Sequence, residues 1–255
     1  MTAELFTKHY SDPQRCAAAV RHYAWLAAHA RPLRQPELRV IGPRHLAFDE
    51  IDGRHAQPRD LPLLAAMMGD AHGAAWTGEL HRARLNQTHP LPGGFRLHDY
   101  VASRTLVLQR RWEQGFLANY QAMRDMTALL RRSATGPVAF YKDSNPRNFL
   151  ITQAGEIYTV DVDDLTLAPF GYDLAKLIHT LALAHGQLEP NQVREALGRY
   201  NEAAMGHHPS LGSTHSKRLA DFLQLHRALT APYEDRPHYP YAHLQPDQPH
   251  SQERA

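Results

Sequence analysis

Three polar side chains between residues 143 and 161 have the types that metal-assisted phosphoryl transfer requires. Asn148 follows Asp143 by five residues, and Asp161 ends an apolar run beyond a Gln-Ala-Gly turn. Carboxylate and amide oxygens are the hard ligands that Mg²⁺ prefers. Phosphoryl transfer also needs an aspartate beside the acceptor hydroxyl, and an Asn and a second Asp on the metal that bridges the phosphates. This order predicts a catalytic Asp143 with Asn148 and Asp161 as metal ligands.

Short strands are the elements expected to position these residues. Apolar runs bounded by turn residues lie at 137–140, 149–152 and 157–160. Runs of this length between turn signals are typical of β-strands. The polar loop that carries Asp143 and Asn148 therefore leads into a hairpin whose second strand ends at Asp161. Loops and strand ends on a rigid scaffold are common places for catalytic residues.

The ordered set of motifs resembles the aminoglycoside phosphotransferase-like kinases, a family that includes the choline kinase type. In that family a loop reading roughly His-Gly-Asp-x-x-x-x-Asn is followed by a hairpin, Asp-Phe-Asp/Glu-Asp and Tyr-Asp-Leu-Ala. The corresponding segments here are Tyr141-Lys142-Asp143-x-x-x-x-Asn148, Asp161-Val162-Asp163-Asp164 and Tyr172-Asp173-Leu174-Ala175. The chain departs from the family where Tyr and Lys replace His and Gly. Because the motifs occur in the expected structural context, they support the resemblance together.

The resemblance implies an α+β, protein-kinase-like fold of two lobes. Residues 1–54 are expected to form a small, β-rich nucleotide-binding lobe with the hinge. Residues 55–231 are expected to form a larger, mainly helical lobe that carries the catalytic and metal-binding loops. The Pro- and His-rich remainder, 232–255, is expected to be a tail with a disordered end. Helices are predicted over 13–30, 61–76, 98–114, 116–133, 189–205 and 213–230, with a further helix starting at Asp173.

The nucleotide-binding residues are assigned by the resemblance. Lys8 lies in a short predicted strand before a helix, where the family has its phosphate-contacting lysine. Without the downstream motifs, it would be interpreted as an ordinary edge-strand lysine. The hinge, whose main-chain groups are expected to receive the base of ATP or GTP, corresponds to Glu50, Ile51, Asp52 and Gly53.

The predicted nucleotide lobe is abbreviated in two respects. Kinase folds normally place a glycine-bearing hairpin before the lysine, but only seven residues precede Lys8 here and none is glycine. The helix that follows should present a Glu to that lysine, yet no acidic residue lies between Asp12 and Glu37. Arg21 and His22 occupy the place where the carboxylate is expected. The lobe is therefore predicted to be truncated or differently closed.

Three further residues receive supporting assignments. Lys142, beside Asp143, either helps to neutralise the transferred phosphoryl group or faces solvent. Asp163, like its neighbour Asp164, is either a second metal ligand or an exposed acid at a strand end. In the family, the residue that matches Asp173 braces the catalytic loop, and its position at a helix start suits a carboxylate that accepts loop donors. Asp173 is therefore expected to support the structure rather than to act in catalysis.

The bulk composition limits the classes of partner. The chain has 255 residues, with 28 Lys and Arg against 26 Asp and Glu, giving a formal charge of +2. This balance does not imply a nucleic-acid partner. The lone Cys16 excludes an internal disulfide and is typical of a reducing cytoplasm. No stretch has the length and apolar content of a membrane span. We expect a cytoplasmic protein without nucleic-acid or membrane partners.

These observations predict an ATP-dependent phosphotransferase that uses Mg²⁺, with ATP or GTP as co-substrate and a small-molecule hydroxyl as acceptor. Scattered acids in the C-terminal third weigh against a strongly cationic acceptor. The sequence does not decide whether the acceptor is an antibiotic, as in resistance enzymes, or a metabolite alcohol. The alternative is a pseudokinase, a nucleotide-binding or interaction module without phosphotransfer, which the missing hairpin and helix Glu favour. A protein kinase is less favoured, because no activation segment separates Asp161 from Asp173.

Overall fold

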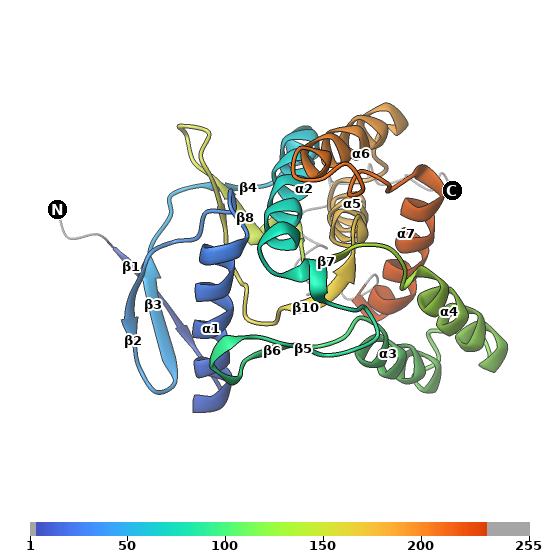
Figure 1. Cartoon of the computed structure of the whole chain (residues 1–255), viewed down its shortest axis with the longest axis horizontal. Coiled ribbons are helices and arrows are strands. Elements are labelled where there is room, and N and C mark those ends of the chain that lie inside the picture. Colours follow the sequence, from blue (N-terminus) through green and yellow to red (C-terminus); the bar gives the residue numbers. More distant parts are fainter. Residues whose placement is uncertain (1–3, 234–255) are drawn as a thin grey trace, which may run out of the picture.

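The computed structural model describes residues 4–233 (Figure 1). At one end of the molecule, three strands form an antiparallel sheet in the order β1-β3-β2, and α1 lies beside it. The bounds of these elements are β1 Leu5–His9, α1 Pro13–His29, β2 Leu38–Ile41 and β3 His45–Asp49. Helix α1 begins where the Asp12 carboxylate accepts the Arg15 N–H, with Pro13 in the first turn. The rings of Tyr23 and Phe48, 4.8 Å apart, join the helix to the sheet.

Helices make up most of the remaining chain. Their bounds are α2 Leu61–Gly78, α3 Val101–Glu113, α4 Tyr120–Ser133, α5 Tyr172–His185, α6 Pro190–Met205 and α7 Ser216–Thr230. Helices α2 and α6 pack closely at Gly69, where an added Cβ would lie 2.2 Å from the Tyr200 carbonyl oxygen. Only glycine allows the two backbones to approach so closely. No helix within residues 4–233 is both long enough and apolar enough to cross a membrane.

The segment with the candidate catalytic residues lies between these two regions (Figure 1). Its strands are β4 Arg54–His55, β7 Val138–Tyr141, β8 Phe149–Ile151, β9 Ile157–Thr159 and β10 Thr166–Pro169. The hairpin β8–β9 pairs with β4, and β7 pairs antiparallel with β10. The predicted hairpin is therefore present. Strand β10 was not predicted from the sequence, because it is short, ends in proline and is defined by its pairing with β7.

A second small hairpin links the two ends of the molecule. It consists of β5 (His89–Pro90) and β6 (Arg96–Leu97), and Figure 1 shows it running from α3 toward α1. At its tip, Phe95 packs edge-on against His22 of α1, with ring centroids 4.8 Å apart. Single-turn 3₁₀ segments lie at Pro58–Asp60, Leu80–Arg82, Pro92–Gly94, Pro146–Asn148 and Ala231–Tyr233.

The observed elements make up the predicted α+β, two-lobe, kinase-like fold. One continuous core of buried apolar side chains extends from α1 through β7 to α7. Phe140 of β7 joins the two ends, since it contacts both Trp25 of α1 and His72 of α2 edge-on. Most of the predicted tail, from residue 234 onward, lies outside the described residues.

Candidate active site

The candidate catalytic residue Asp143 and the candidate metal ligand Asp161 share an unusual backbone conformation. Asp143 has a φ of 61° and Asp161 a φ of 57°, and within residues 4–233 they are the only non-glycine residues with positive φ. Aspartate tolerates this left-handed region better than most residues, because its short side chain can hydrogen-bond locally. Such conformations cluster at functional sites, where the surrounding structure holds them in place. The backbone therefore distinguishes the two residues that the motif had selected.

The Asp143 carboxylate is held through one of its oxygens. The Tyr141 hydroxyl donates a hydrogen bond to Oδ1 at 2.8 Å, and the Lys176 ammonium lies 3.4 Å from the same atom. Half of the Asp143 side chain remains exposed. Burial acts to raise the pKa of this carboxyl, but Lys176 and Tyr141 outweigh it, so the pKa lies below its ordinary value. The carboxylate is therefore ionised, fixed and accessible.

Asn148 is connected to both aspartates. Its side-chain Nδ2 donates to the Asp143 carbonyl oxygen at 2.9 Å, and its own carbonyl accepts the Val160 N–H at 3.0 Å. The second bond brings Asn148 beside the residue that precedes Asp161. Because the amide nitrogen is engaged, the side chain has its oxygen left for a ligand. Asn148 is 5% exposed, so its orientation is set by packing as well as by hydrogen bonds.

Lys8 pairs with two aspartates from the end of β9. Its ammonium contacts Asp161 Oδ1 and lies 2.7 Å from Asp163 Oδ2. Burial lowers the pKa of Lys8, but the hydrogen bonds to the two carboxylates exceed this effect and raise it. The Tyr10 hydroxyl donates to the second oxygen of Asp163 at 3.0 Å. Asp163 thus supplies the carboxylate that the sequence lacks on α1.

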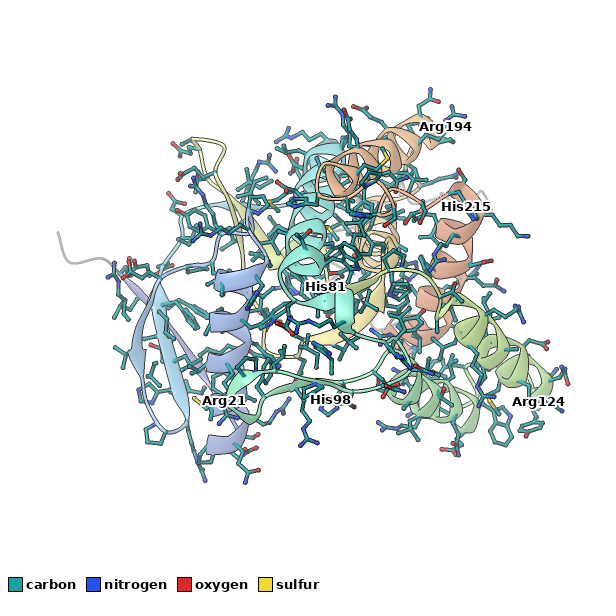
Figure 2. The ribbon with its side chains drawn as sticks, viewed as in Figure 1. Arg21, His81, His98, Arg124, Arg194 and His215 are labelled. Carbon is teal, nitrogen blue, oxygen red and sulfur yellow. The ribbon has the colours of Figure 1, made fainter. Side chains whose placement is uncertain are left out.

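The α1 residues at the expected Glu position have different surroundings. Arg21 is exposed, and so is His98, the residue after β6. Figure 2 labels both residues in the lower part of the molecule. His22 is buried, and its Nδ1 contacts the Asp163 carbonyl oxygen. Burial lowers the pKa of His22, so the ring is neutral near pH 7 and its Nδ1–H donates to that carbonyl. Helix α1 therefore contacts the backbone carbonyl of Asp163 through His22, whereas the family would use a Glu of this helix to contact the lysine.

A cleft of about 330 Å³ lies between the three-stranded sheet and the β8–β9 hairpin. Phe6, Phe48 and Leu150 supply apolar walls, while Lys8 and Asp161 lie in its lining. An apolar cleft bordered by a few charged groups is typical of small-molecule sites. A larger hollow of about 710 Å³ lies beside α1, but it contains none of the candidate residues.

The predicted hinge only partly lines this cleft. Glu50 and Ile51 are among its lining residues, whereas Asp52 and Gly53 line a separate surface depression with Thr152. The Glu50 N–H is already bonded to the Glu4 carbonyl at 2.9 Å. It is therefore not free to contact a base, so a main-chain contact at the hinge would use the Glu50 carbonyl or the groups that follow it.

Lys142 is buried, so the solvent-facing alternative is wrong. Its side chain is 2% exposed, and its ammonium lies 4.2 Å from the centroid of the Phe149 ring. No described residue forms a hydrogen bond with this nitrogen. Burial lowers the pKa of Lys142 to about 8, although Asp173 and Asp143 act to raise it. A lysine in such surroundings loses its proton more easily than a surface lysine does.

The auxiliary acids have different exposures. Asp163 is paired with Lys8 and its side chain is 22% exposed, so the interpretation as an exposed acid at a strand end is wrong for it. That description fits Asp164, whose side chain is 82% exposed. Asp173 is buried and accepts the backbone N–H groups of Lys142 and Ser144, at 3.2 and 2.8 Å. These two bonds fix the chain on both sides of Asp143.

The sequence did not assign a role to three residues that contact this loop. The Tyr141 hydroxyl and Lys176 contact the Asp143 carboxylate directly. Arg104 is buried against the Tyr141 ring, 4.9 Å from its centroid. For Lys176 a signal was available, because it follows Asp173 by three residues on a predicted helix and must share its face. Nothing in the sequence indicates the contact made by Arg104 of α3.

The oxygen donors at the site suit a hard divalent cation. Within residues 4–233, no three His, Cys, Asp or Glu side chains converge as a metal site. A cation here would therefore depend on an amide oxygen as well as on carboxylates. The free Asn148 oxygen and the Asp161 carboxylate, which is 56% exposed, meet that requirement.

Comparison with known proteins gives structural matches only. No family model and no curated protein matches the chain. A macrolide 2'-phosphotransferase from Brachybacterium faecium is 13% identical with a TM-score of 0.61, covering 91% of this chain and 77% of its own. An aminoglycoside 3'-phosphotransferase of type VIII is 20% identical with a TM-score of 0.53, covering 89% and 85%.

An amicoumacin kinase, solved in complex with AMP-PNP, Ca²⁺ and Ami, is 15% identical with a TM-score of 0.54, covering 90% of this chain and 72% of its own. These three proteins differ in substrate but share one architecture. The chain therefore has the protein-kinase-like fold of the aminoglycoside phosphotransferase and choline kinase-type enzymes, as its motifs predicted.

Proposed function

We propose that the protein transfers the γ-phosphoryl group of a nucleoside triphosphate to a hydroxyl group of a small molecule. The observation that carries this proposal is the connection of Asp143, Asn148 and Asp161. Asn148 bonds to the Asp143 carbonyl through its side chain and to the Val160 N–H through its backbone. Phosphoryl transfer in kinase folds uses this set of an acidic residue, an amide and a second acidic residue.

Asp143 acts on the acceptor hydroxyl in this proposal. Its Oδ1 is occupied by Tyr141 and Lys176, while Oδ2 accepts no hydrogen bond from a described residue. Oδ2 therefore orients the hydroxyl and accepts its proton as the acceptor oxygen bonds to the γ-phosphorus. The bond between that phosphorus and the β–γ bridging oxygen breaks in the same step, which releases the nucleoside diphosphate. Positioning and charge neutralisation supply most of the rate enhancement in this chemistry, because the transition state is loose.

The nucleotide occupies the cleft between the sheet and the β8–β9 hairpin. Its base packs against the apolar walls near Ile51, and its phosphates lie toward Lys8. The Lys8 ammonium exchanges part of its contact with Asp161 for the phosphates. Lys142 remains a candidate for neutralising the transferred group, although its ammonium lies over Phe149.

Mg²⁺ would be held by Asn148 and Asp161. When bound, it neutralises charge on the β- and γ-phosphates. The chain's own contribution is to keep both ligands in place through the Asn148 bonds to residues 143 and 160. Asp163 would add a further ligand only if its carboxylate left the Lys8 ammonium and bound the cation instead.

The acceptor belongs to the class of hydroxylated antibiotics and metabolite alcohols. Proteins of this fold include a macrolide phosphotransferase, an aminoglycoside phosphotransferase and an amicoumacin kinase. Lys176 places a positive charge 3.4 Å from the Asp143 carboxylate. This charge disfavours an ammonium group next to the reacting hydroxyl, so a neutral acceptor fits better than a polycation.

A pseudokinase is the second candidate, and one observation favours it. Strand β1 pairs only with β3, so no described hairpin covers the phosphate end of the cleft. A protein that binds nucleotide without transferring phosphate would show a Mg²⁺-dependent thermal shift with ATP or GTP and no labelled product with any acceptor.

The decisive experiment is a phosphotransfer screen with labelled ATP and GTP over panels of antibiotics, nucleosides, sugars and amino alcohols. Wild type should label an acceptor, whereas Asp143→Asn should lose about 100- to 10,000-fold in kcat. Asn is chosen because it tolerates the left-handed backbone that Ala would strain. Asp164→Asn, an exposed acid in the same segment, is the matched control. Turnover in Asp143→Asn at the wild-type rate would refute the assignment.

A further inference from the structure

Asp143 is supported from its helical side by groups that the proposed chemistry does not itself require. The supporting residues are Tyr141, Lys176 and Arg104. Tyr141 stands where the resembling kinases have a histidine, and it precedes Asp143 by two residues on an extended strand end. Strand β7 ends at Tyr141, and Asp143 lies two residues on in the loop, where its left-handed backbone brings its carboxylate to the Tyr141 hydroxyl.

Lys176 reaches the same oxygen from the start of the second turn of α5. It follows Asp173 by three residues and lies on the same helix face. Asp173 accepts the backbone N–H groups of residues 142 and 144, and Lys176 contacts the side chain between them. One helical turn therefore holds both the backbone and the carboxylate of the loop. Lys176 is 6% exposed, so its ammonium has little freedom to leave.

Arg104 holds the Tyr141 ring from behind. Its guanidinium carbon lies 4.6, 4.9 and 4.8 Å from the ring centroids of Tyr100, Tyr141 and Tyr172. It donates to the Tyr172 hydroxyl and the Tyr100 carbonyl, both at 3.1 Å. Among the described residues, no carboxylate lies within ion-pair distance of Arg104. A buried guanidinium without a carboxylate is costly, which indicates that the aromatic faces and these bonds hold it for its orientation.

We infer that Tyr141 and Lys176 are positioning residues for Asp143, and that Arg104 acts through Tyr141. Both donors contact Oδ1, so they fix the carboxylate plane and leave Oδ2 without a hydrogen bond from a described residue. A carboxylate held by two donors of different elements cannot rotate about its side-chain torsions without breaking both contacts. This inference deepens the proposed function and rests on it for the role of Oδ2, whereas the positioning itself does not depend on activity.

The structural arm of the test needs no substrate. Crystal structures of the ligand-free wild type and of the Tyr141→Phe, Lys176→Met double variant are compared at the Asp143 side chain. We expect one conformer in the wild type and a rotated or divided conformer in the variant. An unchanged Asp143 conformer in the double variant would overturn the inference, whether or not the protein transfers phosphate.

The kinetic arm uses MgATP with the acceptor that the wild type labels. Lys176→Met and Tyr141→Phe should each lower kcat by about 10- to 100-fold while KM for ATP changes by less than about 2-fold, because misplacement of a reacting group affects the chemical step. Lys176→Gln, which keeps a donor, should recover part of that loss. Arg104→Lys should behave as Tyr141→Phe does, because lysine lacks the planar stacking surface.

Matched controls separate positioning from stability. Tyr200→Phe also removes a buried hydroxyl, one that accepts the Gly171 N–H, but it does not touch Asp143. Lys217→Met removes an exposed lysine of α7. Both controls should keep the wild-type kcat. If Tyr200→Phe lowers kcat as much as Tyr141→Phe, the effect is one of stability and the inference fails. If the wild type labels no acceptor, the proposed function fails while the structural arm still decides the positioning.

Discussion

The two halves of the candidate site are held by different kinds of contact. Around Asp143, the supporting groups are buried or partly buried: the buried Asp173 holds the backbone, and the buried Lys176 and partly buried Tyr141 hold the carboxylate. Around Lys8, the contacts are partly exposed ion pairs with Asp161 and Asp163. Buried hydrogen bonds are costly to break, whereas exposed ion pairs contribute little and exchange readily.

This difference suits the proposed functions of the two halves, which are orientation of the acceptor by Asp143 and binding of the nucleotide near Lys8. The Asp143 half, which we propose orients the acceptor, is held by buried and partly buried contacts before any ligand binds, so little ordering remains for the reaction step. The half that binds the nucleotide keeps its charges paired with one another until phosphates and a cation can replace those pairs. Three variants test the contrast.

Asp173→Ala should have the largest effect on stability. Removing the carboxylate leaves the Lys142 and Ser144 N–H groups without acceptors in a buried loop. Each unsatisfied group costs about 1–3 kcal/mol, so the free energy of unfolding should fall by about 3 kcal/mol or more. Urea denaturation measures this change. Asp70→Ala is the control, because its His207 contact is partly exposed and should be worth less than about 1 kcal/mol. Similar losses in both variants would contradict the contrast.

Lys142→Met should change stability in the opposite direction. Lowering the lysine pKa from 10.5 to about 8 corresponds to roughly 3 kcal/mol of destabilisation at pH 7. Between about pH 8 and 10.5 the unfolded wild type binds more protons at this residue than the folded wild type, so wild-type stability rises with pH. Methionine has no such dependence. The variant should therefore be more stable at pH 7 by up to about 3 kcal/mol, and the gain should disappear near pH 10.5.

Denaturation of both proteins at pH 7, 9 and 10.5 measures this difference. A constant gap between them would show that the ammonium is not the cause. The same variant separates two effects, because a gain in stability with a loss of kcat would indicate that Lys142 also neutralises the transferred phosphoryl group. A gain in stability with an unchanged kcat would indicate a buried charge without a part in the reaction.

Asp163→Asn should have the smallest effect on stability, because the Lys8 and Asp163 side chains are 25% and 22% exposed. The free energy of unfolding should fall by about 1 kcal/mol or less. Loss of the second carboxylate leaves Lys8 held by Asp161 alone, so KM for ATP should rise about 3- to 10-fold, by roughly 1 kcal/mol of binding free energy. Steady-state kinetics measure this rise.

The control for this variant is Asp164→Asn, whose side chain is 82% exposed and lies one residue away. It should leave KM for ATP unchanged. Raising the ionic strength should weaken the wild-type Lys8 contacts and bring its KM closer to that of Asp163→Asn. If the two variants have the same KM, Asp163 is not the carboxylate that supports Lys8.

Much of the fold could be predicted from local signals. Helix α1 starts at a cap-forming Asp12 and Pro13, and the hairpin β8–β9 turns at Gly155, where φ is 80°. Strand β10 was missed, because four residues ending in proline form a strand only by pairing with β7. Local propensity determines where helices and turns begin, whereas short strands depend on a partner that lies far away in the sequence.

The sequence by itself determined the chemical set at the site and its order: an acid, an amide and a second acid at fixed spacing, followed by the helix that begins at Asp173. These features are local, so they could be read from residue types and turn signals. The sequence left open whether Lys142 faces solvent, and only its packing against Phe149 in the tertiary structure shows that it lies inside.

The tertiary structure alone decided which charges meet. Lys8 and Asp163 are 155 residues apart in the sequence but form an ion pair. Arg104 contacts the Tyr141 ring from helix α3. Such contacts depend on how the sheet, α3 and α5 pack together, and a single sequence carries no local signal for that packing. The physical reason is that hydrogen bonds and ion pairs act over a few ångströms in space, whatever the distance along the chain.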